Sequence, residues 1–318
     1  MAAVAVRRIE FEGLPNTRDL GGLPAADGLV VRPRRLLRSG TLTEGTPADL
    51  RRLVDEFDLR TVVDFRTEVE ASGSPDPAIP GVRHVYDPIL EASAIGITRD
   101  EGSDEAAVAA VSSAGPSSSA GPSSGSGSAS PSDSASPSDT SDQPKRRRNK
   151  KLNVIDGMYS ADFDATAYME SFYVKAVTGK GPIARYRAFF DILLAQGDTG
   201  SVLWHCSMGK GRAGLGTAMV LMALGVPRYA IVEDFLATNE FLREVNEADA
   251  DVHAQKVAPE ERPDLKRRLL DLYSVKPSYL RAALRAVCDL DGSPDAYLER
   301  ELGVGPAERA RLLELYTE

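Results

Sequence analysis

A cysteine and an arginine separated by five residues form a pair that could perform chemistry. They are Cys206 and Arg212, in the segment W-H-C-S-M-G-K-G-R-A-G-L-G that runs from Trp204 to Gly216. An apolar stretch precedes this segment and a helical pattern follows it, so we expect the segment to join a strand to a helix. Small residues in such a loop let successive backbone N–H groups converge on an anion, and the positive end of the following helix faces the same point. The pattern predicts a phosphate site.

The side-chain types suggest a role for each member of the loop. Arg212 can meet two phosphoryl oxygens with its planar guanidinium, and Lys210 adds a second positive charge at the rim. The same field stabilises a thiolate, so we expect Cys206 to act as a nucleophile at neutral pH. His205 is expected to fix the loop through a backbone hydrogen bond and to have no acid–base role. The residues expected to surround the phosphate are Ser207, Met208, Gly209, Lys210 and Gly211.

Two other interpretations of these residues compete with a phosphate site. A lone cysteine at a strand end is usually a small buried apolar residue, and Cys288, which has no comparable neighbours, keeps that interpretation. The loop also matches G-x-G-x-x-G, the fingerprint of dinucleotide-binding oxidoreductases, through Gly209, Gly211 and Gly214. That fingerprint needs a second strand after the helix, where this sequence predicts another helix, and it leaves Arg212 without a role. The spacing of cysteine and arginine therefore favours phosphoryl chemistry.

The loop resembles the H-C-x5-R signature of the cysteine-dependent protein tyrosine phosphatase superfamily, and most of the chain is similar to a bacterial branch of it. Outside the signature, the blocks that carry the resemblance are NTRDLGG (Asn16–Gly22), RSGTL (Arg38–Leu42), VVDFRTEVE (Val62–Glu70), EDFLATN (Glu233–Asn239) and the tail Val275–Val304. The resemblance implies hydrolysis of phosphotyrosine proteins, with dual specificity as an extension. It also implies a phosphocysteine on Cys206, stabilisation of the transferred group by Arg212 and the loop amides, and no metal or organic cofactor.

Two positions depart from the family pattern. Ala213 stands where the family usually has a Ser or Thr whose hydroxyl eases departure of the cysteine thiolate, and Gly211 stands where close bacterial relatives have Asp. The sequence G-K-G-R instead resembles the loop of phosphoinositide 3-phosphatases. Three alternatives therefore stay open: a protein phosphatase, a phosphoinositide phosphatase, and a catalytically weak phospho-binding module.

The sequence does not name the general acid that would protonate the leaving group. Asp87 and Glu91, in HVYDPILE, follow a predicted strand, about where related bacterial enzymes carry their proposed acid, although either could be a solvated loop carboxylate. Asp64, at the end of TVVDF, is expected to pair with a nearby arginine or a loop amide. Asp19, together with Arg18, is expected to brace the phosphate loop.

The hydrophobic periodicity predicts an α/β fold in which a largely parallel central sheet is covered by helices and followed by a helical C-terminal part. The expected strands are Leu36–Arg38, Thr61–Phe65, Val82–Tyr86 and Ser201–His205. The expected helical segments are Pro47–Phe57, Ala165–Ala176, Ile183–Gln196, Arg212–Leu224, Arg228–Glu247 and Ser278–Asp289. The apolar residues of Ala165–Tyr173 and Phe235–Phe241 are expected to pack in the core, and the resemblance also implies a position for these helices over the active-site entrance.

A Ser/Gly/Pro-rich tract interrupts what we expect to be one domain covering residues 1–318. Residues 98–152 have too few apolar side chains to offset the entropy of ordering, so we expect a disordered insertion there. With 38 basic and 47 acidic residues the net charge is −9, which predicts no nucleic-acid partner and requires any anion site to be local. Two cysteines, no signal-peptide pattern and no long apolar run predict a cytoplasmic protein without stable membrane insertion. Leaderless secretion and the oligomeric state stay open.

Overall fold

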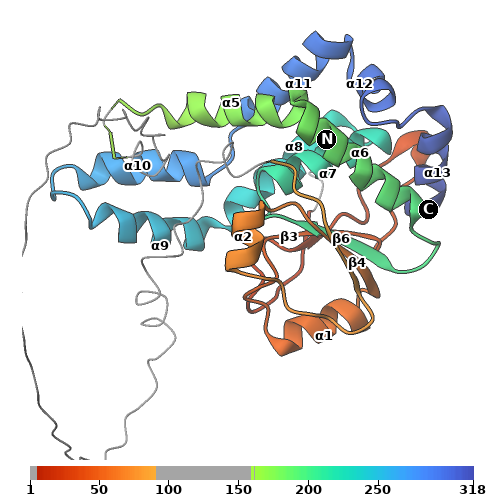
Figure 1. Ribbon diagram of the computed structural model, residues 1–318, viewed down its shortest axis with the longest axis horizontal. Helices are drawn as coiled ribbons and strands as arrows, with labels where there is room; N and C mark the ends of the chain where they lie inside the picture. Colours follow the sequence, from red (N-terminus) through yellow and green to blue (C-terminus); the bar gives the residue numbers. More distant parts are fainter. Residues whose placement is uncertain (1–5, 91–158, 161) are drawn as a thin grey trace, which may run out of the picture. The chain divides into compact units, whose positions relative to one another are not determined.

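A six-stranded mixed sheet lies at the centre of the chain (Figure 1). The structure, a computed structural model, describes residues 6–90, 159–160 and 162–318. The strand order is β1-β2-β3-β6-β4-β5, in which β3, β6, β4 and β5 are parallel and β1 and β2 form an antiparallel edge. The strands are β1 (Arg7–Arg8), β2 (Arg18–Asp19), β3 (Leu36–Ser39), β4 (Leu59–Asp64), β5 (Arg83–Tyr86) and β6 (Ser201–His205). The α/β fold with a largely parallel sheet is thus confirmed.

Alternating side chains of the central strands enter two separate cores. On one face, Val63 and Trp204 belong to the larger apolar cluster, which the C-terminal helices complete. On the other face, Val62 and Leu203 pack in a smaller cluster with Leu53 of the first helix. Successive residues of a strand point to opposite faces, so adjacent positions of β4 and β6 serve different cores. Because β6 is buried on both faces, it reads as a short apolar run.

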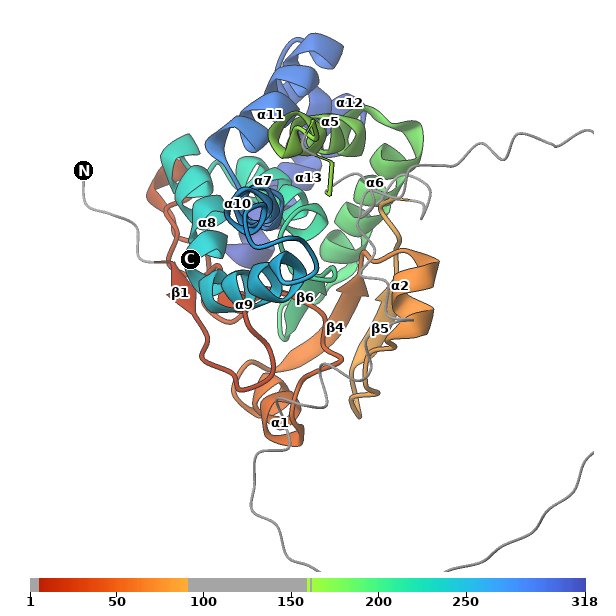
Figure 2. The ribbon, with the colours of Figure 1, turned by 90° about the vertical axis from the view of Figure 1, so that its left-hand side faces the viewer.

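Helices cover both faces of this sheet (Figures 1 and 2). Helix α1 lies on one side, and α6 and α7 lie on the other. Helices α9 and α10 run side by side in opposite directions. The helices that precede the C-terminal part are α1 (Pro47–Asp55), α2 (Glu68–Gly73), α5 (Ala165–Thr178), α6 (Lys180–Ala195) and α7 (Arg212–Ala223). The C-terminal part consists of α8 (Arg228–Phe241), α9 (Arg243–Ala254), α10 (Arg262–Tyr273), α11 (Pro277–Asp291), α12 (Pro294–Arg300) and α13 (Pro306–Tyr316).

The differences from the sequence-based expectations fall at short or irregular elements. The helical pattern over Arg228–Glu247 divides at Leu242, which has φ −104° and ψ 4° and separates α8 from α9. The antiparallel edge strands β1 and β2 have two residues each, too few to show any periodicity. The expected insertion at 98–152 lies outside the described residues. Within the described part of the chain, no helix combines the length and apolar character needed to cross a bilayer.

The carboxyl ends of three parallel strands meet at one edge of the sheet. Asp64 pairs in register with His205 on one side and with Tyr86 on the other. The residues that follow these strand ends therefore emerge side by side, including Cys206 after β6 and Asp87 after β5. In open sheets of this kind, ligands bind at this edge, and two of the predicted catalytic residues, Cys206 and Asp87, follow these strand ends.

Candidate active site

The loop Cys206–Gly211 turns sharply between the central strand and the buried helix α7, which begins at Arg212. Gly209 adopts φ +62°, and a Cβ at this position would lie 2.3 Å from the backbone oxygen of Ser39. Only glycine accommodates both constraints. The strand–loop–helix geometry expected from the spacing is confirmed, and it brings Cys206 to the N-terminal end of α7, where the helix dipole favours negative charge.

Two side chains from distant parts of the chain hold the loop carbonyl groups. Asn16 Nδ2 donates to the backbone oxygens of Met208 (2.8 Å) and Gly209 (3.2 Å). Arg38 Nε also donates to the Gly209 oxygen, at 3.0 Å, and its Nη1 contacts Asp234 Oδ2 at 2.6 Å. Asn16 and Arg38 therefore fix the backbone of the loop at Met208 and Gly209.

Asp19 does not provide the brace that we expected of it. Its carboxylate accepts hydrogen bonds from the backbone N–H groups of Gly21 and Arg34, both at 2.9 Å, and so fixes a turn beside β2. Arg18 is fully buried and donates to the backbone oxygen of Asp234 at 2.8 Å. Burial lowers the pKa of Arg18 to about 9. Its Nη1 also pairs with Asp234 Oδ1 at 3.3 Å. Arg18 therefore supports the loop indirectly, through the carboxylate that also holds Arg38.

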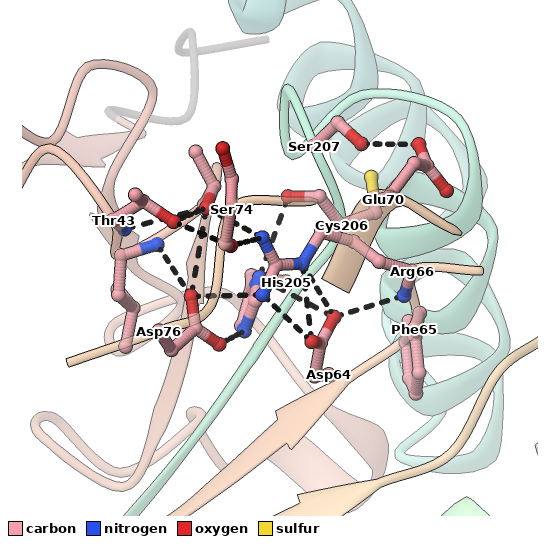
Figure 3. A network of polar contacts seen from close by, with 12 residues as sticks. Thr43, Asp64, Phe65, Arg66, Glu70, Ser74, Asp76, His205, Cys206 and Ser207 are labelled. Carbon is pink, nitrogen blue, oxygen red and sulfur yellow. Dashed lines mark hydrogen bonds and ion pairs between the residues drawn. The ribbon is translucent and has the colours of Figure 1, made fainter. Parts of the chain in front are cut away.

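Arg212 is bound end-on by a carboxylate from another element. Its Nη1 and Nη2 atoms each lie 2.7 Å from an oxygen of Glu70, on helix α2. The hydroxyl of Ser207 also donates to Glu70. Figure 3 shows Glu70 and Ser207 beside the sulfur of Cys206. No sequence pattern pointed to this carboxylate, although it lies inside the block VVDFRTEVE.

A second group of charges lies below the cysteine (Figure 3). His205 Nε2 approaches Asp76 Oδ2 to 2.9 Å, and its Nδ1 lies 3.4 Å from the backbone oxygen of Cys206, as expected for a loop-fixing residue. Asp64, Asp76 and His205 bring three potential metal-ligand atoms within 4.8 Å. Arg66, however, pairs with Asp64 at 2.8 Å and with Asp76 at 3.1 Å, so a guanidinium already balances both carboxylates. The arginine partner expected for Asp64 is confirmed, and the group forms an ion-pair network.

The ammonium of Lys210 is bonded to helix α10. It donates to the backbone oxygens of Leu272 (2.6 Å) and Tyr273 (3.0 Å), at the C-terminal end of α10. Removal of the ammonium from water lowers the pKa of Lys210 to about 8, although the nearby Cys206 opposes that shift. A cation at a helix C-terminus is favourable, so Lys210 ties α10 to the loop.

Aromatic residues of α5 enclose the other side of the loop. Phe172 and Tyr173 are buried in the same core cluster as Cys206, which is 3% exposed. A Cβ on Gly211 would lie 2.9 Å from the Phe172 ring. Packing against α5 therefore leaves little room for a side chain at Gly211. The core-packing role expected for Ala165–Tyr173 is confirmed.

Asp87, one of the two carboxylates expected to donate a proton, is buried. It follows β5, and its backbone N–H donates to the Asp64 oxygen at 2.9 Å. Burial raises the pKa of Asp87 to about 6, although Arg185, 3.6 Å away, opposes this. Oδ2 of Asp87 is buried and has no hydrogen-bond partner in the described part of the chain, which favours the neutral carboxyl. Glu91, the other candidate, lies outside the described residues.

A thiol and a guanidinium lie at the carboxyl end of a central parallel strand, with an amide loop between them, which is the arrangement expected of a cysteine-dependent phosphatase. Residues 9–318 match the tyrosine phosphatase family. A protein of Cupriavidus necator, provisionally named as a tyrosine-protein phosphatase, is 30% identical over 304 residues, which cover 94% of this chain and 86% of the relative. The triple specificity protein phosphatase PtpB of Mycobacterium tuberculosis is 31% identical over 153 residues, 46% of this chain and 54% of that protein. The chain therefore belongs to the tyrosine phosphatase family and is a phosphatase enzyme.

Proposed function

We propose that this enzyme removes phosphate from phosphotyrosine proteins through a phosphocysteine formed on Cys206. The observation that carries the proposal is the position of Cys206 at the end of β6 and at the start of α7, six positions before Arg212. Converging amides, a helix N-terminus and a guanidinium together favour a phosphoryl dianion and a thiolate nucleophile at the same place.

The first step forms a sulfur–phosphorus bond and breaks the phosphorus–oxygen bond to the leaving group. The electron pair of that bond goes to the leaving oxygen, which takes a proton from neutral Asp87. Arg212 and the loop amides stabilise the charge on the three equatorial phosphoryl oxygens. In the second step, water attacks phosphorus, Asp87 accepts a proton from it, and the sulfur departs as a thiolate.

The position of Lys210 favours a protein substrate over a phosphoinositide. The resemblance to phosphoinositide phosphatases depended on a basic residue at the rim, whereas the Lys210 ammonium is bonded to α10. One relative is named for triple specificity, so phosphotyrosine peptide, phosphoserine peptide and phosphoinositide should be compared side by side. We expect the largest kcat/KM on phosphotyrosine peptide, and a preference for phosphoinositide would overturn this choice of substrate.

The test of the mechanism is hydrolysis of p-nitrophenyl phosphate. The wild-type enzyme should release nitrophenol, and Cys206→Ser and Arg212→Ala should abolish release. The matched control is Cys288→Ser, because Cys288 is an exposed cysteine of α11, and this variant should behave as wild type. Rapid mixing with acid should trap phosphate on the wild-type protein but not on Cys206→Ser. If Cys206→Ser keeps wild-type activity, the proposed nucleophile is wrong. If the wild-type protein binds vanadate without turnover, it is a phospho-binding module.

A further inference from the structure

Tyr173, on helix α5, carries a buried hydroxyl group that the reaction described above does not use. Its side chain is 0% exposed, and its oxygen has no hydrogen-bond partner in the described part of the chain. A buried hydroxyl without a partner costs free energy, because the folded protein does not replace the hydrogen bonds that water made. Since buried polar groups of native proteins are as a rule paired, this unpaired hydroxyl needs an explanation.

The hydroxyl of Tyr173 lies against the phosphate loop. A Cβ on Gly211 would lie 3.8 Å from the hydroxyl oxygen, and Gly211 directly precedes Arg212. Cys206 belongs to the same buried cluster as Tyr173 and is itself only 3% exposed. Because the reacting thiol is enclosed to nearly the same degree, the burial of Tyr173 does not separate its hydroxyl from the site.

This hydroxyl keeps its proton. Burial raises the pKa of Tyr173 above the ordinary value of a phenol, and the nearby Cys206 adds to that rise, although Arg38 opposes it. Tyr173 therefore remains a neutral hydrogen-bond donor throughout the pH range of an enzyme assay.

Aromatic neighbours from three helices hold the ring of Tyr173 in place. Its centroid lies 5.6 Å from that of Phe172 in α5, 5.8 Å from that of Phe235 in α8 and 5.6 Å from that of Tyr279 in α11. Figure 2 shows α5 beside α11. A ring packed in this way presents its hydroxyl in a fixed place before any ligand arrives, so little entropy is lost when the hydroxyl is used.

Two other hydroxyl groups beside the loop are already bonded. Ser207 donates to Glu70, and Tyr186 donates to the backbone oxygen of Arg212 at 2.9 Å. Tyr173 differs from both because its donor has no acceptor within the described residues. A fixed, unpaired donor beside an anion site indicates that its acceptor arrives with the ligand.

We propose that the Tyr173 hydroxyl donates a hydrogen bond to the phosphoryl group held at Cys206. The inference rests on the proposed function, and it adds a contact from α5 to those of Arg212 and the loop amides. A phosphoryl oxygen is charged, and a hydrogen bond to a charged acceptor is stronger than one between neutral groups. The free enzyme bears the cost of the unpaired hydroxyl, and the complex with a phosphoryl group recovers it.

The test compares Tyr173→Phe with Tyr297→Phe, since phenylalanine keeps the ring and removes only the hydroxyl. Tyr297 is the matched control because it is another tyrosine with 0% exposure, and its hydroxyl donates to the backbone oxygen of Val177 at 2.8 Å. In calorimetric titrations, inorganic phosphate and vanadate should each bind about tenfold more weakly to Tyr173→Phe than to wild type. The value of kcat/KM on p-nitrophenyl phosphate should fall by a similar factor. Tyr297→Phe should match wild type in both measurements.

Thermal melts distinguish this role from a structural one. The Tm of ligand-free Tyr173→Phe should equal or exceed that of wild type, because the variant loses no hydrogen bond and no longer buries an unpaired hydroxyl. Tyr297→Phe should melt at a lower temperature, because its bond to Val177 is lost. Saturating vanadate should raise the Tm of wild type more than that of Tyr173→Phe.

Wild-type affinity for both oxyanions in Tyr173→Phe would overturn the proposal. A Tm of ligand-free Tyr173→Phe as low as that of Tyr297→Phe would also overturn it, because the hydroxyl would then be bonded within the free protein. If wild type binds the oxyanions without hydrolysing the ester, the proposed function fails, and the titrations still test Tyr173.

Discussion

Replacing Asp87 with Asn should lower activity and, at neutral pH, raise stability. The carboxyl is buried at the end of β5, and its pKa rises from 3.8 to about 6 because burial disfavours the charged form. A catalytic acid needs this property, since it must carry a proton near neutral pH. Above about pH 6, however, the folded protein carries a carboxylate charge on Asp87 in a buried site that disfavours it.

The magnitude follows from the shift of about two pKa units, each worth about 1.4 kcal/mol. The folded-state pKa lies above the unfolded value, so protonation of Asp87 contributes stability that is fully present below pH 3.8 and lost as the pH rises through 6. Between pH 4 and pH 8 the free energy of unfolding of wild type should fall by up to about 3 kcal/mol from this group. Because Asn does not ionise, the free energy of unfolding of Asp87→Asn should not show this decrease between pH 4 and pH 8. The kcat of this variant on phosphotyrosine should fall by about 10²–10⁴, as expected for loss of a general acid.

Urea unfolding at a series of pH values and the pH profile of kcat/KM measure the two effects separately. Wild-type kcat/KM should decline above an apparent pKa of about 6, and the decline should disappear in Asp87→Asn. Asp191→Asn, at an exposed aspartate of α6, is the matched control and should retain both wild-type pH dependences. Full activity with an unchanged alkaline limb in Asp87→Asn would refute the reasoning, and the donor would have to be another group.

Four other substitutions test the loop and its supports. Gly209→Ala should lower both Tm and kcat, because φ is +62° and the new Cβ would clash with backbone at 2.3 Å; thermal melts and ester hydrolysis would measure this. Asp234→Asn should destabilise the protein by about 3–5 kcal/mol in urea unfolding, because it leaves two buried arginines with an uncharged partner. Lys210→Met should speed hydrogen exchange at the C-terminal end of α10, since two hydrogen bonds to carbonyl oxygens are lost. Ala213→Ser should raise the steady-state rate and reduce the pre-steady-state burst in stopped-flow hydrolysis, and an unchanged burst would contradict the role given to the missing hydroxyl.

Local sequence determined the parts of this protein that depend on neighbouring residues. The run Ser201–His205, the glycines after it and the apolar helix after Arg212 specify strand, loop and helix in order, so the positions of Cys206 and Arg212 could be predicted. Short runs of apolar and β-branched residues likewise predicted the parallel strands. The two-residue antiparallel strands could not be predicted, because pairing with β3 rather than a pattern of their own defines them.

Tertiary structure decided which charged side chains meet. Nothing in the sequence pairs Glu70 with Arg212, or directs Lys210 to the end of α10 rather than to a phosphate. These contacts arise because the sheet order brings β4 and β6 together and because α10 packs near the loop. Asp87 likewise acquires its raised pKa only through burial. The sequence alone determines the spacing of Cys206 and Arg212. The orientation of Arg212 depends on segments that meet only in the folded chain.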